Sequence, residues 1–443
     1  MSAGTATRIE DRCRAILGAE DVLTDTATAR YRLGNTPPRL AVLPDDEIEV
    51  SRVLALAEGE GLGVVPWGAG AHQCLGELPS RYDVALDLRR LNRILAYEPG
   101  DMTATVQAGI GLDEVQYRVG DHGQIFALDP PMAEQATLGG VVAANLSGPL
   151  RCRYGTARDL VLGVRVAHAN GTITKGGSRV VKNATAYDIT KLYIGSHGTL
   201  AVILEATLRL HPRPAVERGW WLTGSEIEAC QEVATNVLGS HLAPHRVEIL
   251  DGGGAEECAC PSIGPALLVS FAGVPEAVKD QGATLAGMAE ASGMRATEIA
   301  NPMEAFRRVR DFPWKARQST APGCRATLRG SVLPSDCAKA ARTIREVLGG
   351  SSRMGLAMTA SHGTFRGEAR AASESALIDG LAAARRALES LGGFLILMEA
   401  TRPVCEALGV WGSAPAAVNR MHQLKDAFDP KHVLNPGRFV DGI

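Results

Sequence analysis

The sequence of 443 residues has little net charge, few aromatic residues and no long apolar run. Its 46 Lys and Arg residues against 49 Asp and Glu residues give a net charge of −3, which offers no basic surface to a phosphate backbone. Aromatic residues make up 5% of the chain, too few for platforms that stack bases. The longest apolar stretches, at 266–274 and 394–398, have the length of strands and are too short to span a bilayer. We therefore expect neither nucleic-acid binding nor direct insertion into a membrane.

Signals for export and for a structural metal are missing as well. The first 15 residues contain no apolar core of a signal peptide, which predicts a cytoplasmic protein. The nine cysteines are scattered, and the close pair Cys258 and Cys260 does not have the spacing of a zinc site. The cysteines also lack the clustering that an iron–sulfur centre needs. Scattered cysteines fit a reduced compartment.

Glycine, in contrast, is abundant, with 49 of 443 residues, or about 11% against a typical ~7%. The first glycine group follows a strand-like run and begins Gly68-Ala69-Gly70-Ala71. Small residues at these positions allow successive backbone N–H groups to converge on an anion such as a phosphate. The spacing is GxGx₅G, ending at Gly76, and no ribose-binding acid follows, which disfavours a nicotinamide-binding unit. Taken alone, the loop is better explained as a tight turn.

Four further groups of small residues follow in the same half of the chain. The group at 130–148 places Asn145 and Ser147 among its glycines, and close helix packing explains the glycines but not these two polar residues. The other groups lie at 154–163, 181–188 and 195–203. Each group alone is compatible with a turn or a helix cap. Their order and spacing together are far more specific than any one of them.

This succession resembles the FAD-binding domain of the vanillyl-alcohol oxidase/p-cresol methylhydroxylase (PCMH) family. The resemblance covers residues 36–214 and resumes at 429–439, where NPGRF is similar to the closing loop of the family. Within the family, the segments PPMAEQATLGG, RDLVLGVRV, VKNATAYD and LRGSVLPSD are most similar to the E subunit of bacterial glycolate oxidase. The resemblance implies an α+β protein that binds FAD.

The implied fold has four parts. Residues 1–35 form an N-terminal helical extension, and residues 36–214 form a PCMH-type FAD-binding domain of two α/β subdomains. Residues 215–414 form an α+β substrate or cap domain. Residues 415–443 form a helix and a loop that return to the FAD-binding domain. The cluster at 212–214, Pro-Arg-Pro, marks the boundary between the two large domains.

The cap domain is expected to alternate strands and longer helices. The strand-like segments are 247–250, 266–274 and 326–333. The helix-like segments are 276–292, 335–348 and 368–391. No phosphate-binding loop occurs among them, so this half is predicted to meet the substrate rather than the cofactor phosphates.

The resemblance also assigns residues to the cofactor. In the family, the loop corresponding to 68–76 and the segment corresponding to 137–148 hold the pyrophosphate. His72 lies one position beyond the histidine that links the flavin covalently in some relatives, so we expect FAD to be held noncovalently. The residues carried over as cofactor-binding are Gly68, Ala69, Gly70, Ala71, His72, Gly76, Pro131, Thr137, Gly139, Gly140, Asn145, Gly148, Tyr154, Gly155, Gly198, Ile203, Asn435 and Arg438.

Some members of the family oxidise 2-hydroxy acids, a reaction that needs a cation for the carboxylate and a base for the hydroxyl proton. A planar guanidinium suits the carboxylate, and Arg329, in the LRGS segment, is a better candidate than Arg325, with a surface arginine as the alternative. His362 is the candidate base because a histidine titrates near neutrality, the alternative being a loop histidine with one backbone hydrogen bond. Trp314 and Lys315 are candidates for the border of the flavin ring.

Related dehydrogenases carry an HxGDGNxH metal motif that this chain lacks. The corresponding stretch at 361–367 reads SHGTFRG, with a single histidine and no carboxylate. One histidine does not make a metal site. No catalytic metal is therefore expected.

Three functions fit the sequence. The first is an FAD-dependent dehydrogenase, or a subunit of one, that oxidises a small 2-hydroxy acid such as glycolate or D-lactate. Its electrons would pass to a quinone or to the iron–sulfur and second flavin subunits of a glycolate-oxidase-like complex, which would also provide any peripheral contact with the inner membrane. The second is an FAD oxidase of a sugar or another alcohol. The third is a flavin-carrying subunit without activity of its own.

Overall fold

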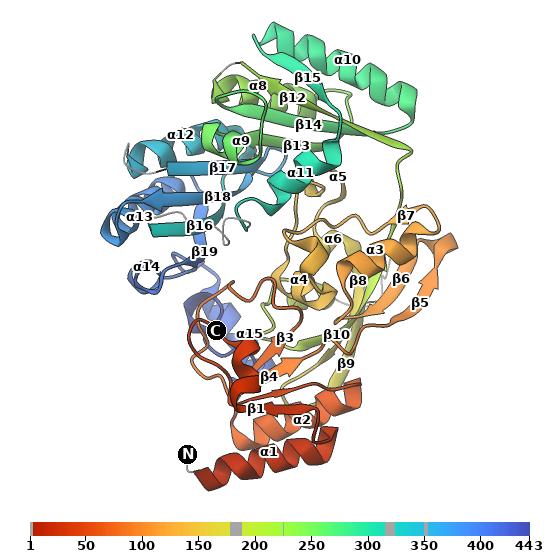
Figure 1. Cartoon of the computed structure of the whole chain (residues 1–443), viewed down its shortest axis with the longest axis vertical. Helices are drawn as coiled ribbons and strands as arrows, with labels where there is room; N and C mark the ends of the chain where they lie inside the picture. The colour runs from red at the N-terminus through yellow and green to blue at the C-terminus, as the bar shows by residue number, and fades with distance from the viewer. Residues whose placement is uncertain (1–2, 178–187, 225, 315–323, 350–352) are drawn as a thin grey trace.

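The structure is a computed structural model that describes residues 3–177, 188–224, 226–314, 324–349 and 353–443. Helices and strands are interspersed along the chain, as expected for an α+β fold. Figure 1 shows two units stacked along the long axis of the molecule. We call the part built on strands β1–β11 the first unit and the part built on strands β12–β19 the second unit.

The first unit begins with a small sheet of four strands in the order β1-β2-β4-β3. Strands β2, β4 and β3 are parallel, and β1 pairs with β2 in antiparallel fashion. The crossover helix α2 is capped by Asp46, whose carboxylate accepts two backbone N–H groups, and stops at Gly61 with φ +67°. The elements of this part are α1 Ala3–Leu17, β1 Val22–Thr24, β2 Leu40–Val42, α2 Glu47–Glu60, β3 Val64–Trp67 and β4 Val84–Asp87.

The second sheet of the first unit has five antiparallel strands in the order β5-β6-β10-β8-β9. A short ribbon of β7 and β11 follows at its margin. The strands are β5 Ile94–Glu98, β6 Thr103–Gln107, β7 Gln124–Ile125, β8 Val161–Ala167, β9 Ile173–Gly177, β10 Val202–Arg209 and β11 His211–Pro212. The helices are α3 Leu112–Gly120, α4 Leu138–Ala144, α5 Arg151–Tyr154, α6 Ala157–Leu160 and α7 Thr190–Tyr193.

The second unit is built on one sheet of eight antiparallel strands in the order β15-β12-β14-β13-β17-β18-β16-β19. Neighbouring residues of a strand point to opposite faces, so Trp220 packs in the core under α8, α10, α12 and α13, while Trp221 packs with α9 and α11. The strands are β12 Val216–Thr223, β13 Pro244–Leu250, β14 Ala266–Gly273, β15 Arg295–Ile299, β16 Cys324–Ser331, β17 Arg353–Thr359, β18 Thr364–Ala371 and β19 Phe394–Ala400. The helices are α8 Ile227–Gly239, α9 Gly252–Glu257, α10 Pro275–Ala291, α11 Pro302–Asp311, α12 Cys337–Leu348 and α13 Glu374–Ser390.

One predicted helix is wrong at its start. Residues 368–371, expected to open a helix over 368–391, form the end of strand β18. This strand lies between β16 and β17, with Arg366 opposite Arg329 and Glu368 opposite Gly355. Pairing with two neighbouring strands overrides the local helix preference. Helix α13 begins only after Ser373, whose hydroxyl accepts the N–H of Ala376.

The last segment returns to the first unit, as predicted. After α14 (Arg402–Leu408) and α15 (Val418–Phe428), Leu434 forms a parallel bridge with Val64 of β3. The fully buried Lys425 donates to Asp429 at 2.7 Å and to the carbonyl of Leu434 at 2.9 Å. These contacts fix the C-terminal loop beside the loop that follows β3.

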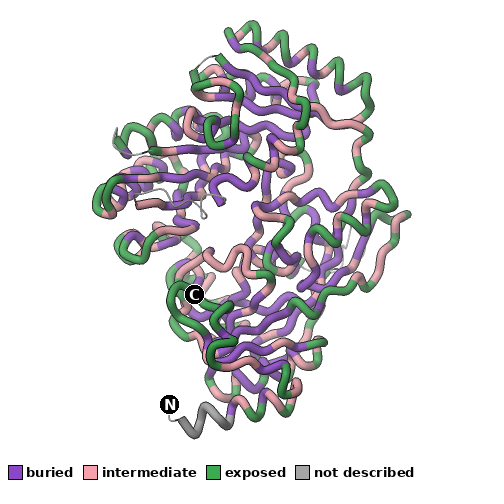
Figure 2. Tube along the Cα trace, in the orientation of Figure 1, coloured by how far each residue is buried: buried purple, intermediate pink, exposed green. Residues whose placement is uncertain are grey.

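Burial follows the layers of the fold. Figure 2 shows buried strands in both units, with exposed residues concentrated on the outer faces of helices and in loops. None of the helices in the described residues is long and apolar enough to cross a membrane.

Candidate functional site

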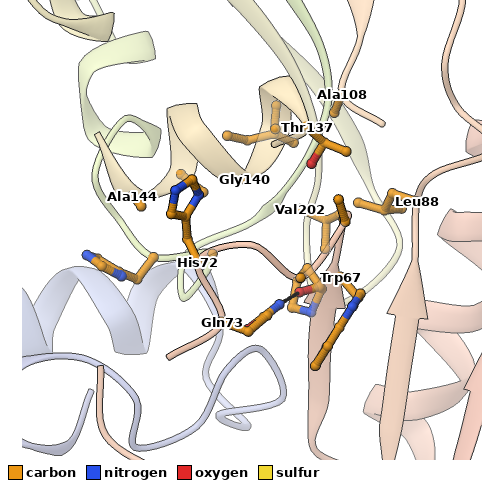
Figure 3. Close-up of a pocket in the computed structure, with 18 of the residues that line it drawn as sticks. Trp67, His72, Gln73, Leu88, Ala108, Thr137, Gly140, Ala144 and Val202 are labelled. Atoms are coloured by element: carbon orange, nitrogen blue, oxygen red, sulfur yellow. Dashed lines mark hydrogen bonds between the residues drawn. The ribbon is translucent and has the colours of Figure 1, made fainter. Parts of the chain in front are cut away.

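A cavity opens in the first unit where four segments far apart in the sequence meet. These are the loop after β3, the start of α4, the turn before β10 and the C-terminal loop. Figure 3 shows His72 and Gln73 on one wall and Gly140 and Ala144 of α4 on another. Twelve of the residues predicted to bind the cofactor line this cavity: Gly68, Ala69, Gly70, Ala71, His72, Thr137, Gly139, Gly140, Gly198, Ile203, Asn435 and Arg438.

The loop after β3 presents unused backbone donors. Among the hydrogen bonds of the described residues, none is donated by the N–H groups of Gly68, Ala69 or Gly70. Gly70 has φ +81°, a conformation that glycine adopts without strain. Three successive free N–H groups form the kind of nest that binds an anion.

Glycines allow the walls of the cavity to approach each other. A Cβ atom on Gly68 would lie 2.1 Å from Oγ1 of Thr137. A Cβ atom on Gly139 would lie 2.8 Å from the Cβ of Ala108. Both distances are shorter than a non-bonded contact permits, so any larger residue would push the walls apart. The glycines are therefore needed for the shape of the cavity.

Polar atoms beside the cavity lack partners. Asn435 donates from Nδ2 to the carbonyl of His197 at 2.7 Å, but its buried Oδ1 has no hydrogen bond within the described residues. Asn145 caps the end of α4, and its buried Oδ1 also has no hydrogen bond within the described residues. A buried polar atom without a partner costs about 1–3 kcal/mol. The oxygen of Asn435, which lines the cavity, is thus available to accept a hydrogen bond from a bound group.

The cavity carries an uncompensated positive charge. The buried guanidinium of Arg438 donates to the side chain and the main chain of Gln73, both at 2.7 Å, and to the carbonyl of Leu75 at 2.6 Å. No carboxylate of the described residues forms an ion pair with it. Burial lowers the pKa of Arg438 to about 10, so the group remains charged at neutral pH. A cation beside free N–H groups suits a pyrophosphate.

A second titratable group, His197, borders the same cavity. Its ring stacks on Phe439 with centroids 5.1 Å apart and meets the edge of Trp411 at 5.0 Å. Burial and the positive charges of Arg438 and Arg329 lower the pKa of His197 to about 3. The ring is therefore neutral at pH 7, with one nitrogen able to donate and one able to accept.

Replacing His197 by asparagine is expected to make the stability of the apoprotein less sensitive to acid. Asparagine tolerates the backbone here, where φ is +53°. The pKa of His197 is about 3 in the folded chain, below its value of about 6.5 in an unfolded chain. The neutral ring therefore stabilises the fold above pH 6.5, and this contribution is lost as the pH falls toward 3.

Denaturant titrations between pH 4 and pH 7 measure this effect. The unfolding free energy of the wild type should fall more steeply than that of the variant, by up to about 1.4 kcal/mol per pH unit. Equal slopes would show that the ring is not held neutral by its surroundings.

A smaller cavity adjoins the first and extends into the second unit. Its walls include Pro131 and Gly148 of the first unit and Arg329 of the second. The Nε2–H of His72 donates to the carbonyl of Pro131 at 2.8 Å, and the ring of His72 meets that of Trp314 edge-on at 5.2 Å. Because His72 lines the first cavity and Pro131 and Trp314 line the second, the two cavities share this wall.

Of the two predicted catalytic residues, Arg329 lines the smaller cavity and His362 does not. Arg329 is half-buried, and burial together with the charge of Arg151 lowers its pKa to about 10. His362 is exposed on the loop between β17 and β18, with Nδ1 2.7 Å from Oγ of Ser361. Partial burial and the charge of Arg151 lower the pKa of His362, and the charge of Asp159 partly opposes this lowering. Both side chains are thus linked electrostatically to Arg151.

Four predicted cofactor residues do not line either cavity. Gly76 allows the C-terminal loop to approach, since a Cβ there would lie 2.5 Å from the carbonyl oxygen of Arg438. The hydroxyl of Tyr154 forms a hydrogen bond of 3.0 Å with Nε2 of His245 in the second unit. The remaining two are Asn145, described above, and Gly155, which has φ +83°. Residues 181–187, from the group of small residues at 181–188, and Lys315 lie outside the described residues.

A larger cavity, of about 860 Å³, lies between α3, the segment 124–134 and α11. Its prominent charges are compensated. Arg246 forms an ion pair with Glu217, and Arg310 pairs with Glu134 at 2.7 Å. The ion pair between Arg310 and Glu134 joins the two units. The charges of this cavity are therefore neutralised by other side chains of the protein.

A metal site is not apparent in the part of the chain that the structure describes. No three His, Cys, Asp or Glu side chains there gather closely enough to hold an ion.

Several residues of the two cavities were not anticipated from the sequence. Leu88 and Ala108 line the first cavity, as does His197, and Arg151 lines the second. Two of them carried a signal: Ala108 is a small residue that precedes Gly109, and His197 lies within the sequence GSHG. Arg151 carried none, because an arginine in a polar RCRY segment is ordinarily exposed.

Two family models match the chain. Residues 38–177 match the FAD binding domain, and residues 412–439 match the C-terminal domain of FAD linked oxidases. The first match contains the loop after β3 and helix α4, and the second contains Asn435 and Arg438.

Two curated relatives at 30% identity or more share sequence with about half of the chain. It is 30% identical over 225 residues to glycolate oxidase subunit GlcD of Bacillus subtilis, which covers 51% of this chain and 47% of that protein. It is 36% identical over 242 residues to the mitochondrial D-lactate dehydrogenase (cytochrome) of Arabidopsis thaliana, covering 52% and 42%. The chain thus spans about half the length of these relatives. With the probable mitochondrial D-lactate dehydrogenase of Danio rerio it is 26% identical, with 100% and 94% covered.

Solved structures share the whole architecture. p-Cresol methylhydroxylase with substrate bound superposes with a TM-score of 0.77 at 15% identity, covering 99% of this chain and 97% of that one. Alkyldihydroxyacetonephosphate synthase gives 0.77 at 17% identity, covering 99% and 86%. At these identities the likeness shows the fold.

The two matched domains and the shared fold support a PCMH-type family of FAD-linked oxidases for this chain. The predicted fold class and the predicted cofactor, FAD, are confirmed. The free N–H groups, the cation and the unpartnered amide oxygen of Asn435 fit that cofactor. The particular likeness to the E subunit, the noncovalent attachment and the domain boundaries stay predictions.

Proposed function

We propose that the chain is an FAD-dependent dehydrogenase of a small 2-hydroxy acid, or a subunit of one. The observation that carries this proposal is the guanidinium of Arg329, which has no acidic partner in the described residues and lies in the cavity next to the flavin site. A carboxylate is the natural partner of such a group. The relatives named above support the class of substrate, since glycolate and D-lactate are both 2-hydroxy acids.

The residues take the following roles in this proposal. Bound FAD supplies an acceptor for the hydride that leaves the substrate carbon. The N–H groups at 68–70 and Arg438 hold the pyrophosphate, while Arg329 binds the substrate carboxylate. His362 accepts the hydroxyl proton at Nε2, because Ser361 already engages Nδ1 at 2.7 Å. Trp314, between the two cavities, helps to exclude water.

Electrons would then leave to a quinone or to a partner subunit with an iron–sulfur centre. The cysteines of the chain do not gather into a set of ligands for such a centre. The exposure of His362 favours one alternative, a flavin-carrying subunit that turns nothing over without a partner chain. An oxidase of a sugar or a neutral alcohol is disfavoured, because it leaves the charge of Arg329 without an anion.

Anaerobic addition of glycolate, D-lactate or D-2-hydroxyglutarate to the purified yellow protein is expected to bleach the visible flavin absorbance. The reason is that Arg329 selects an acid, so glycerol and the methyl ester of lactate, which lack a carboxylate, should leave the colour unchanged. Bleaching by glycerol alone would establish an alcohol oxidase instead. Bleaching that appears only after a partner chain is added would establish the non-catalytic subunit.

A further inference from the structure

The smaller cavity holds more positive charge than a single carboxylate requires. Arg329, Arg151 and Arg366 all line it. Arg366 is compensated, since its Nη2 lies 2.7 Å from Oε2 of Glu248 and its Nε donates to the carbonyl of Val309 at 2.9 Å. Within the described residues the guanidinium groups of Arg329 and Arg151 have no ion pair, and Nε of Arg151 is buried without a hydrogen bond. Two cations therefore face the cavity unopposed.

No acid elsewhere in the chain supplies the missing negative charge. Burial lowers the pKa of Arg151, and the charge of Asp159 only partly opposes this. Asp159 forms no ion pair with Arg151, and its Oδ2 accepts the N–H of Thr156 at 2.8 Å. Asp and Glu are absent from the sequence of the residues that the structure does not describe, which are 1–2, 178–187, 225, 315–323 and 350–352. Two cations in a partly desolvated cavity repel each other, so the free protein bears a cost that bound anions remove.

The two arginines act on different ends of the cavity. The charge of Arg329 lowers the pKa of His197, which lines the flavin cavity. The charge of Arg151 lowers the pKa of His362, on the exposed loop after β17. Arg329 is therefore the inner arginine, beside the flavin, and Arg151 is the outer one.

We propose that this cavity takes a 2-hydroxy acid with a second carboxylate, and that Arg151 is the residue that selects it. The proposal rests on the function proposed above and narrows its substrate class. Arg329 binds the carboxylate next to the hydroxyl-bearing carbon, and Arg151 binds the far carboxylate. Short 2-hydroxy dicarboxylates satisfy both cations, whereas glycolate and lactate satisfy one.

A second use for an unpaired cation is to neutralise the reduced flavin. The positions of the arginines argue against this use for Arg151. Arg329 and Arg438 already place two cations within electrostatic reach of His197, in the wall of the flavin cavity. Arg151 lies beyond Arg329, on the side of His362. Its charge is better placed for a group on the substrate.

Steady-state kinetics of the Arg151→Gln holoenzyme test whether Arg151 selects substrates with a second carboxylate. Racemic malate and 2-hydroxyglutarate serve as diacid probes, and racemic lactate as the monoacid probe. The variant should lose about 10- to 100-fold in kcat/KM for the diacids, mainly through KM. It should lose less than about threefold for lactate, which does not reach Arg151. Arg151→Lys should recover part of the diacid activity, and Arg153→Gln, an exposed arginine on the same helix, should behave as wild type.

A binding measurement separates this inference from the proposed function. Succinate and glutarate cannot be oxidised at a hydroxyl group, and calorimetry should detect their binding to the wild type and to Arg153→Gln but not to Arg151→Gln. If no 2-hydroxy acid bleaches the flavin while this binding depends on Arg151, the proposed function is wrong and the diacid site stands. Equal losses for lactate and malate in Arg151→Gln, or a wild type that prefers lactate, would overturn the inference.

Discussion

Replacing Gly68 by valine is expected to give a folded protein that no longer retains flavin. The cavity walls touch at this point, since a Cβ on Gly68 would lie 2.1 Å from Oγ1 of Thr137. Forcing two additional methyl groups into the contact costs about 1–3 kcal/mol and displaces the loop whose N–H groups face the pyrophosphate. Bound FAD per chain after gel filtration should fall at least about tenfold, because 1.4 kcal/mol already corresponds to that factor in affinity.

A matched substitution controls for the effect of valine itself. Gly100 lies on an exposed turn, and nothing occupies the 4 Å around the position of its Cβ. Gly100→Val should therefore keep full flavin content. Far-ultraviolet circular dichroism should show the same secondary structure in both variants. A Gly68→Val protein that is purified with normal flavin would remove this loop from the cofactor site.

Changing Arg329 to methionine is expected to abolish efficient turnover of 2-hydroxy acids while the flavin remains bound. Arg329 is the inner cation of the smaller cavity and has no acidic partner of its own in the described residues. Losing a buried charge-assisted contact to a carboxylate costs about 2–5 kcal/mol. We therefore expect kcat/KM to fall roughly 100- to 1000-fold, with most of the change in KM.

Two variants make this result specific. Arg329→Lys keeps the charge but not the planar pair of donors, so it should recover only part of the activity. Arg325→Met removes an arginine from the same strand, β16, that does not line the cavity, and should act as wild type. The visible spectrum of the bound flavin should be retained in all three. An Arg329→Met enzyme with an unchanged KM would exclude Arg329 from substrate binding.

The glycine pattern predicted much of the flavin site, because its requirement is local. A backbone that approaches a phosphate closely needs residues without side chains, and such residues are visible in the sequence as at Gly68 and Gly70. The parts of the cavity wall that come from strand ends could not be predicted from a local pattern. Leu88 and Ala108 reach the cavity only because the two sheets of the first unit bring the ends of β4 and β6 to it. Ordinary apolar residues give no sign of that role.

The substrate cavity was harder to predict, because its chemistry depends on which of its arginines lack a carboxylate partner. Arg329 was identified from its segment, but its importance comes from the lack of a carboxylate beside it, whereas Arg366 on the next strand has Glu248. Arg151 has the same property and was not anticipated. Only the folded chain shows which arginines are paired, since each partner lies far away in the sequence. The strand at 364–371 was misjudged for a similar reason, because its pairing partners are distant.

The bridge between Val64 and Leu434 also sets the order of events during synthesis. One wall of the flavin cavity is translated long before Asn435 and Arg438, which follow the whole second unit in the sequence. A nascent polypeptide therefore exposes an unfinished pocket until the second unit has been made, and the cofactor site can close only after that point. Messages that terminate before residue 433 yield chains with both units present and no means of closing over the dinucleotide, which leaves them open to proteolysis.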